Sequence, residues 1–229
     1  MTISKLIKRL LISVAYLAAI PGCNPAYNDL QSDTRDMPAT GATIKTFVYE
    51  CPDDYSFVAR TENSKVWLFL PGKTVDLPRI TAASGIKYSD GKIIFWSKGS
   101  EALLETGDSR HTGCNNNPAK AIWEHAKLNG VDFRATGNEP GWYLEISNKR
   151  DILLVTDYGQ TTYQFTSATL QSEPHSKSAV YHARNKQNSV EIVITARPCL
   201  DTMSGAAFSS TVSVIVNDKR LAGCGKPLH

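Results

Sequence analysis

Two turns in the first half of the chain carry side chains that could bind a carboxylate. Ser84 stands before Gly85 and Lys98 before Gly99, so both are expected in turns. A lysine ammonium supplies three hydrogen-bond donors and a charge, and a serine hydroxyl can donate or accept. Taken by itself, each residue is most simply interpreted as an ordinary solvated turn residue.

Other residues with acid–base potential are scattered along the chain. Glu139 lies in an Asn-Glu-Pro-Gly turn and Asp201 follows Cys199 in a loop, where carboxylates usually cap turns. The 5 histidines show no spacing that joins them to a serine and a carboxylate. We therefore expect that the chain has no catalytic residue and is not an enzyme.

The N-terminus has the layout of an export signal. A basic cluster within residues 5–9 precedes an apolar run over residues 10–20. Crossing a bilayer takes about 20 apolar residues, so this run is too short for a membrane span. Residues 1–22 are thus predicted to be a signal peptide that is removed.

The end of this segment indicates a lipid anchor. Ile-Pro-Gly before Cys23 resembles a bacterial lipobox, which implies cleavage before Cys23 and lipid on its thiol. Ordinary secretion, with Cys23 incidental, is the alternative. Residues 23–43 are rich in polar residues, glycine and proline, and are predicted to be a flexible tether. The membrane is therefore an expected partner, through this anchor.

The remaining cysteines predict disulfides. The chain has 5 cysteines, and setting Cys23 aside leaves an even number in an oxidising compartment. A structural metal is the competing interpretation, but no C-x-x-C or H-E-x-x-H spacing supports it, and no cofactor is expected. The four fall into two distant pairs, which suggests the bridges Cys51–Cys114 and Cys199–Cys224.

Charge gives little indication of a partner. The chain has 25 basic and 22 acidic residues, and three of the basic ones belong to the signal region. The mature chain is thus close to neutral. No basic stripe appears, which argues against nucleic acid.

The region from residue 44 to 115 has the pattern of a β-barrel. Short segments of alternating apolar residues are separated by turn residues, and Asp90-Gly91 is a strong hairpin signal. Eight such strands with tight turns favour a closed antiparallel barrel. The expected strands are 44–51, 55–61, 65–70, 73–80, 86–88, 92–96, 102–106 and 110–114.

Within this barrel the motifs resemble a known family. Tyr49-Glu50-Cys51, Ala83-Ser84-Gly85-Ile86-Lys87-Tyr88, the segment from Phe95 to Ala102 and the closing Cys114 together look like the membrane-bound inhibitors of c-type lysozyme. The resemblance covers residues 44–115 and implies an eight-stranded barrel. It also implies c-type lysozyme as a protein partner. The lipobox, followed by Asn24 rather than by an aspartate, separately predicts a lipid-anchored place at the bacterial outer membrane, facing the periplasm.

The resemblance further implies which residues bind lysozyme. In that family the serine of an S-G-x-x-Y segment and the lysine of a W-x-K-G segment enter the lysozyme cleft, and here these positions are Ser84 and Lys98. The strand order places both at one end of the barrel. We expect Tyr88 to line the binding loop and Trp96 to lie in the core.

The second half predicts a linking helix and a second β domain. Asn117-Pro118 is typical of a helix start, so residues 116–130 are expected to form a short helix. Residues 131–229 should be a second antiparallel β domain. Its distinctive strings, Phe133 to Trp142, Cys199 to Gly205 and Gly223-Cys224-Gly225, resemble an uncharacterised envelope-lipoprotein domain with no known chemistry. The expected strands are 132–135, 142–147, 151–156, 162–170, 179–185, 190–196 and 211–217.

The sequence thus predicts an all-β protein with two domains, and it leaves a second function open. The alternative to an inhibitor is an envelope lipoprotein that binds a small ligand or acts as a scaffold through its C-terminal domain. A ligand carrier needs a hollow barrel with converging polar groups, whereas an inhibitor needs a filled barrel with protruding loops.

Overall fold

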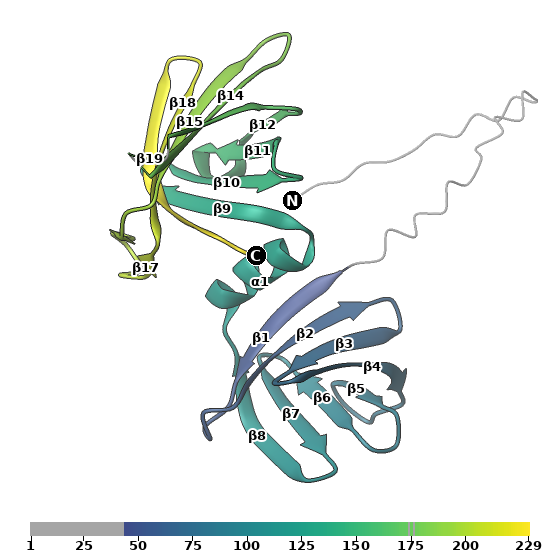
Figure 1. Ribbon diagram of the computed structural model, residues 1–229. Coiled ribbons are helices and arrows are strands. Elements are labelled where there is room, and N and C mark those ends of the chain that lie inside the picture. Colours follow the sequence, from purple (N-terminus) through teal and green to yellow (C-terminus); the bar gives the residue numbers. More distant parts are fainter. Residues whose placement is uncertain (1–43, 174, 176) are drawn as a thin grey trace, which may run out of the picture. The chain divides into compact units, whose positions relative to one another are not determined.

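The computed structural model describes residues 44–173, 175 and 177–229 (Figure 1). The predicted signal peptide 1–22, the lipidated Cys23 and the tether 23–43 lie outside the described residues. The predicted fold class is confirmed: a closed antiparallel barrel, one α-helix and a second, curled antiparallel sheet. Among the described residues, no helix has the length and apolar character that crossing a membrane requires.

The first barrel is a meander of eight strands, in which β8 returns to pair with β1. Alternation of apolar and polar residues turns one side of each strand inward, as the sequence predicts. The strands are β1 (Lys45–Glu50), β2 (Ser56–Glu62), β3 (Lys65–Leu70), β4 (Lys73–Ile80), β5 (Ile86–Ser89), β6 (Ile94–Lys98), β7 (Glu101–Thr106) and β8 (Ser109–Asn116).

Aromatic rings fill the interior of this barrel. The Tyr49 ring stacks on Phe57 at 5.3 Å between centroids and meets Phe95 edge-on at 5.7 Å. All three side chains are almost completely buried. The predicted disulfide Cys51–Cys114 is present, and it joins the residue after β1 to β8.

The linking helix α1 (Pro118–Leu128) begins where the sequence predicts. The Asn117 side-chain oxygen accepts a hydrogen bond from the Lys120 backbone N–H at 3.1 Å, and Pro118 occupies the first helical position, where no N–H is needed. The helix contacts β1 of the barrel and β9 of the second sheet.

The second sheet rolls up until its edges approach each other. Its order is β12-β11-β10-β9-β19-β18-β15-β14-β13, so the two edge strands follow each other in the chain and are joined only by residues 166–168. The Asn185 side-chain amide of the β14–β15 turn also donates to the Gln164 carbonyl of β12 at 3.2 Å, across the gap. The prediction of one strand over 162–170 is therefore wrong, because the chain changes pairing partner between β11 and β14.

A strand that the sequence analysis missed lies inside this sheet. β19 pairs with β9 on one side and β18 on the other. Its Gly-Cys-Gly segment does not resemble a strand, yet the glycines at 223 and 225 are sterically required there. The elements are β9 (Val131–Asn138), β10 (Gly141–Ser147), β11 (Asp151–Thr156), η1 (Asp157–Gly159), β12 (Thr161–Phe165), β13 (Thr169–Glu173), β14 (Ser178–Arg184), β15 (Ser189–Thr195), β16 (Cys199–Leu200), β17 (Ala207–Phe208), β18 (Ser210–Val216) and β19 (Lys219–Pro227).

A tryptophan explains these glycines. Trp142 of β10 faces the core and is 4% exposed. A Cβ atom built on Gly223 would lie 2.1 Å from the Thr136 carbonyl oxygen and 2.8 Å from the Trp142 ring, and one on Gly137 would lie 2.2 Å from the Trp142 indole nitrogen. The two glycines therefore form a notch that holds the indole.

Candidate functional site

Ser84 and Lys98 emerge at the same end of the first barrel, as the strand order predicts. Ser84 lies in the loop 81–85 between β4 and β5, and Lys98 ends β6. The pairing of Ile86 with Ser97 places both residues just beyond the paired region. Both are exposed, and neither side chain has a hydrogen bond or ion pair within the part of the chain that the structure describes. Their polar groups are therefore available to a partner.

Gly85 brings the two residues together. Its backbone is in the left-handed region, with φ of 68°, which suits glycine. A Cβ atom there would lie 2.4 Å from the Ser97 carbonyl oxygen and 3.2 Å from the Lys98 Cβ. The loop thus rests directly on the end of β6, and the missing side chain is what permits the contact.

The expectation that Trp96 lies in the core is wrong. Its neighbour Phe95 points into the barrel, so the alternation of the strand turns Trp96 to the outer face, where it is half-buried. There its indole N–H donates to the Ser84 carbonyl oxygen at 2.8 Å. Trp96 is therefore a residue of the candidate site that sequence reasoning placed elsewhere.

Tyr88 lies inside the barrel rather than on the binding loop. Its side chain is 3% exposed and stacks on Phe95 at 6.0 Å. Burial raises the pKa of its hydroxyl, which keeps the phenol neutral. A partner docking at this end has no access to it, so we remove Tyr88 from the candidate site.

The surroundings of Ser84 and Lys98 combine polar and apolar groups. Lys98 faces Glu101 across the β6–β7 hairpin, and Ile80 and Ile86 are each 39% exposed at this end of the barrel. Apolar surface beside a cation and a hydroxyl is typical of a protein-binding surface. This end therefore presents exposed loop residues with both polar and apolar groups.

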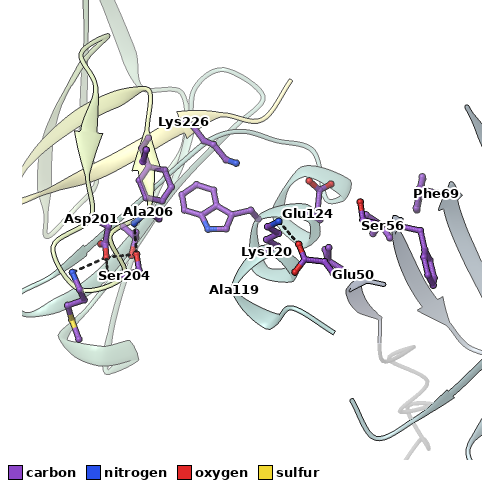
Figure 2. A pocket seen from close by; sticks show the side chains of 18 of the residues that line it. Glu50, Ser56, Phe69, Ala119, Lys120, Glu124, Asp201, Ser204, Ala206 and Lys226 are labelled. Carbon is purple, nitrogen blue, oxygen red and sulfur yellow. Dashed lines mark hydrogen bonds and ion pairs between the residues drawn. The ribbon is translucent and has the colours of Figure 1, made fainter. Parts of the chain in front are cut away.

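The carboxylates of the second domain do not form an acid–base pair. Asp201 is 8% exposed, and its carboxylate accepts hydrogen bonds from the Ser204 N–H at 2.7 Å and the Ser204 hydroxyl at 2.7 Å (Figure 2). It also accepts one from the Asn138 amide at 2.9 Å. These bonds, led by the one from the Ser204 backbone, hold the pKa of Asp201 below its usual range. The group is a turn cap, while Glu139 is exposed in the β9–β10 turn. The arrangement supports no catalytic role.

A hollow of about 800 Å³ lies beside α1 (Figure 2). Its walls include apolar side chains of β1–β3 and of the β16–β17 segment, and Lys120 on its rim already forms an ion pair with Glu50. That ion pair lowers the pKa of Glu50. The interior of the first barrel and the core of the second sheet are instead filled by side chains. Among the described residues no cluster of His, Cys, Asp and Glu could hold a metal.

The first barrel is similar to known proteins over most of its length. Residues 49–112 match the model of a family described as membrane-bound lysozyme-inhibitor of c-type lysozyme. A relative from Yersinia enterocolitica, named membrane-bound lysozyme inhibitor of C-type lysozyme, is 44% identical over 62 residues, which are 27% of this chain and 53% of that protein. The chain thus spans about half the length of this relative. No solved structure matches.

Proposed function

We propose that the first barrel, which is similar to the membrane-bound inhibitors of c-type lysozyme, inhibits these enzymes by inserting Ser84 and Lys98 into their active-site cleft. The observation that carries the proposal is the contact of the Ser84 loop with the base of Lys98 through Gly85. It places the loop that carries the Ser84 hydroxyl beside the base of the Lys98 side chain, and neither polar group has a partner among the described residues.

The chemistry of the target supports this mechanism. A c-type lysozyme cleft holds two carboxyl groups, one kept protonated near neutral pH and one ionised. The Lys98 ammonium matches the ionised group, and the Ser84 hydroxyl can donate to or accept from either. Inhibition consists of occupying the cleft and requires no reaction by this protein, which acts as a binding protein and not as an enzyme.

The proposed place of action is the periplasmic face of the outer membrane, with the lipid on Cys23 as anchor. The relative's name describes it as membrane-bound. Cys23→Ala should release the mature protein into the soluble fraction, because the acyl chains are its attachment. Unchanged fractionation with membranes would refute the anchor and leave the inhibitor proposal untouched.

Binding of a small ligand by the second domain is the less supported function. The core of that domain is packed with side chains, and its buried carboxylate at Asp201 is already satisfied. The hollow in Figure 2 offers apolar walls but few converging polar groups without partners.

The inhibitor proposal is tested by Lys98→Ala, Ser84→Ala and the double variant in a lysozyme assay with melting curves. Truncating one partner of a desolvated charge pair typically costs about 2–5 kcal/mol of binding, and losing a hydroxyl about 1–3 kcal/mol. The loss should appear as faster dissociation, since a near-neutral chain gives little steering.

Lys73→Ala is the matched control. Lys73 is also an exposed lysine at a strand end, but the alternation of turns in the meander places it at the other end of the barrel. It should inhibit like the wild type. Full inhibition by the double variant at wild-type concentrations would refute the mechanism.

A further inference from the structure

Trp96 holds the loop that carries Ser84. Its indole N–H donates to the Ser84 carbonyl oxygen at 2.8 Å. The loop 81–85 has no regular structure, and within the described residues this is the one bond outside the strand ladders that involves it. A segment so exposed is otherwise free to move away from β6.

The contact at Gly85 makes the indole a close neighbour of the loop backbone. A Cβ atom on Gly85 would lie 2.8 Å from the indole nitrogen, as well as 2.4 Å from the Ser97 carbonyl oxygen. The loop backbone therefore fits between the Trp96 ring and the end of β6. A displacement of this loop away from β6 would break the indole bond and carry Ser84 away from Lys98.

The position of Trp96 on the sheet gives the bond its rigidity. Trp96 pairs with Lys87 of β5 on one side and with Leu103 of β7 on the other, and all three are half-buried on the outer face. A ring held by neighbours on both sides loses few conformations when it donates its N–H. The donor is fixed before any partner arrives.

We infer that Trp96 is a positioning residue, which preorganises the Ser84 loop beside Lys98 through its indole N–H. The inference rests on the proposed function for its consequence, inhibition of lysozyme, but its direct effect is on the free protein. A partner then meets a loop that is already ordered, so less affinity is lost to ordering it.

The first test replaces only the donor. In the mature chain Trp96→Phe keeps an aromatic ring and removes the N–H. Backbone amides of residues 83–86 should exchange with deuterium about tenfold faster. Losing one hydrogen bond changes the equilibrium constant for local opening of the loop by about tenfold. Inhibition of a c-type lysozyme should weaken by about tenfold, with slower association and a melting temperature close to wild type.

Trp67→Phe is the matched control. Trp67 also lies on the outer face of this barrel, 40% exposed, and its indole makes no hydrogen bond within the described part of the chain. Both the amide exchange of residues 83–86 and the inhibition should stay at wild-type values. Equal effects of the two substitutions would refute a special role for Trp96.

A second pair of variants tests the steric half of the inference. Gly85→Ala and Gly72→Ala introduce the same methyl at left-handed positions, with φ of 68° and 79°. Only at Gly85 does the methyl meet other atoms, because nothing lies within 4 Å of it at Gly72. Gly85→Ala should weaken inhibition by at least tenfold and speed exchange in the loop, whereas Gly72→Ala should do neither.

The outcomes separate the two ideas. If wild type fails to inhibit lysozyme, the proposed function is wrong, and amide exchange in Trp96→Phe still decides whether the indole orders the loop. If wild type inhibits and Trp96→Phe shows unchanged loop exchange, the inference about Trp96 is wrong. Loss of inhibition that merely follows a lowered melting temperature would also refute it.

Discussion

The side chains of Ser84 and Lys98 extend from the first barrel without a bond to other described residues, whereas Asp201 of the second domain accepts four hydrogen bonds. Both sets of groups lie in or beside turns, and residue type alone indicates a chemical role for neither set. Polar groups that the fold already satisfies stabilise a turn, and polar groups left free can act on a partner. The comparison favours the first barrel for the proposed binding role.

The distinctive sequence strings differ in the same way. In the first barrel, Ser84-Gly85 and Trp96 to Lys98 meet at the surface. In the second, Gly137 and Gly223 meet inside and enclose Trp142. One set of unusual residues builds an exposed feature and the other a packing notch, so an unusual string by itself does not indicate chemistry.

The largest expected effect comes from removing the Trp142 indole from the notch that Gly137 and Gly223 form around it. Trp142→Ala should lower the free energy of unfolding of the second domain by about 3–5 kcal/mol, because it leaves a cavity lined by glycines that cannot fill it. Urea unfolding followed by circular dichroism measures the loss. Lysozyme inhibition should persist, and a parallel loss of inhibition by folded protein would contradict the separation of roles.

The next largest effects come from removing the two disulfides, and the two removals should affect inhibition differently. On the chain-entropy model, losing Cys51–Cys114, with 63 residues of separation, costs about 4 kcal/mol, and losing Cys199–Cys224, with 25, costs about 3.5 kcal/mol. Double serine variants of each pair are compared by thermal unfolding and lysozyme assay. Only the first pair should affect inhibition, through unfolding of its barrel. The reverse pattern would assign the binding role to the second domain.

Removing the satisfied carboxylate should have a smaller effect. Asp201→Ala should destabilise the second domain by about 1–3 kcal/mol, because the donors of its turn lose their acceptor. The lowered pKa of Asp201 also predicts acid sensitivity. Its contribution is complete above about pH 4 and is lost as pH falls from there through the folded pKa. Unfolding curves between pH 2 and 7 should therefore be flatter for the variant, and an equal slope would disprove this.

The smallest effect concerns the helix between the domains. The two ring nitrogens of His125 each lie 2.9 Å from a polar atom, one on Thr46 of β1 and one on Asn129. Burial, followed by the charges of Arg60 and Arg134, lowers its pKa. Its contribution is therefore complete above about pH 6.5 and is lost as pH falls from there through the folded pKa.

Amide exchange in α1 measures this effect. Exchange should rise as the solution is acidified below pH 6.5, after correction for the intrinsic rate. His125→Gln keeps polar groups without a titration and should remove the dependence. A dependence that survives this substitution would place the titrating group elsewhere.

The sequence alone determined the first barrel, the disulfide pairs and the helix start. Alternating residues with tight turns specify antiparallel strands locally, and Asn117-Pro118 specifies a helix start through adjacent atoms. Ser84 and Lys98 were found because their segments resemble a family, and their common end followed from strand order. Each of these inferences depends on neighbours in the chain or on a repeated pattern.

Tertiary structure alone decided what depends on residues distant in sequence. β19 is a strand because β9 and β18 supply partners for its backbone, which outweighs the poor strand propensity of Gly-Cys-Gly. Tyr88 points into the barrel and Trp96 points outward, the reverse of what we expected. The register across β5 and β6 fixes which side of each strand faces the core. The bond from Trp96 to the Ser84 carbonyl joins residues twelve apart in the chain. Only the closed barrel brings these atoms within hydrogen-bonding distance.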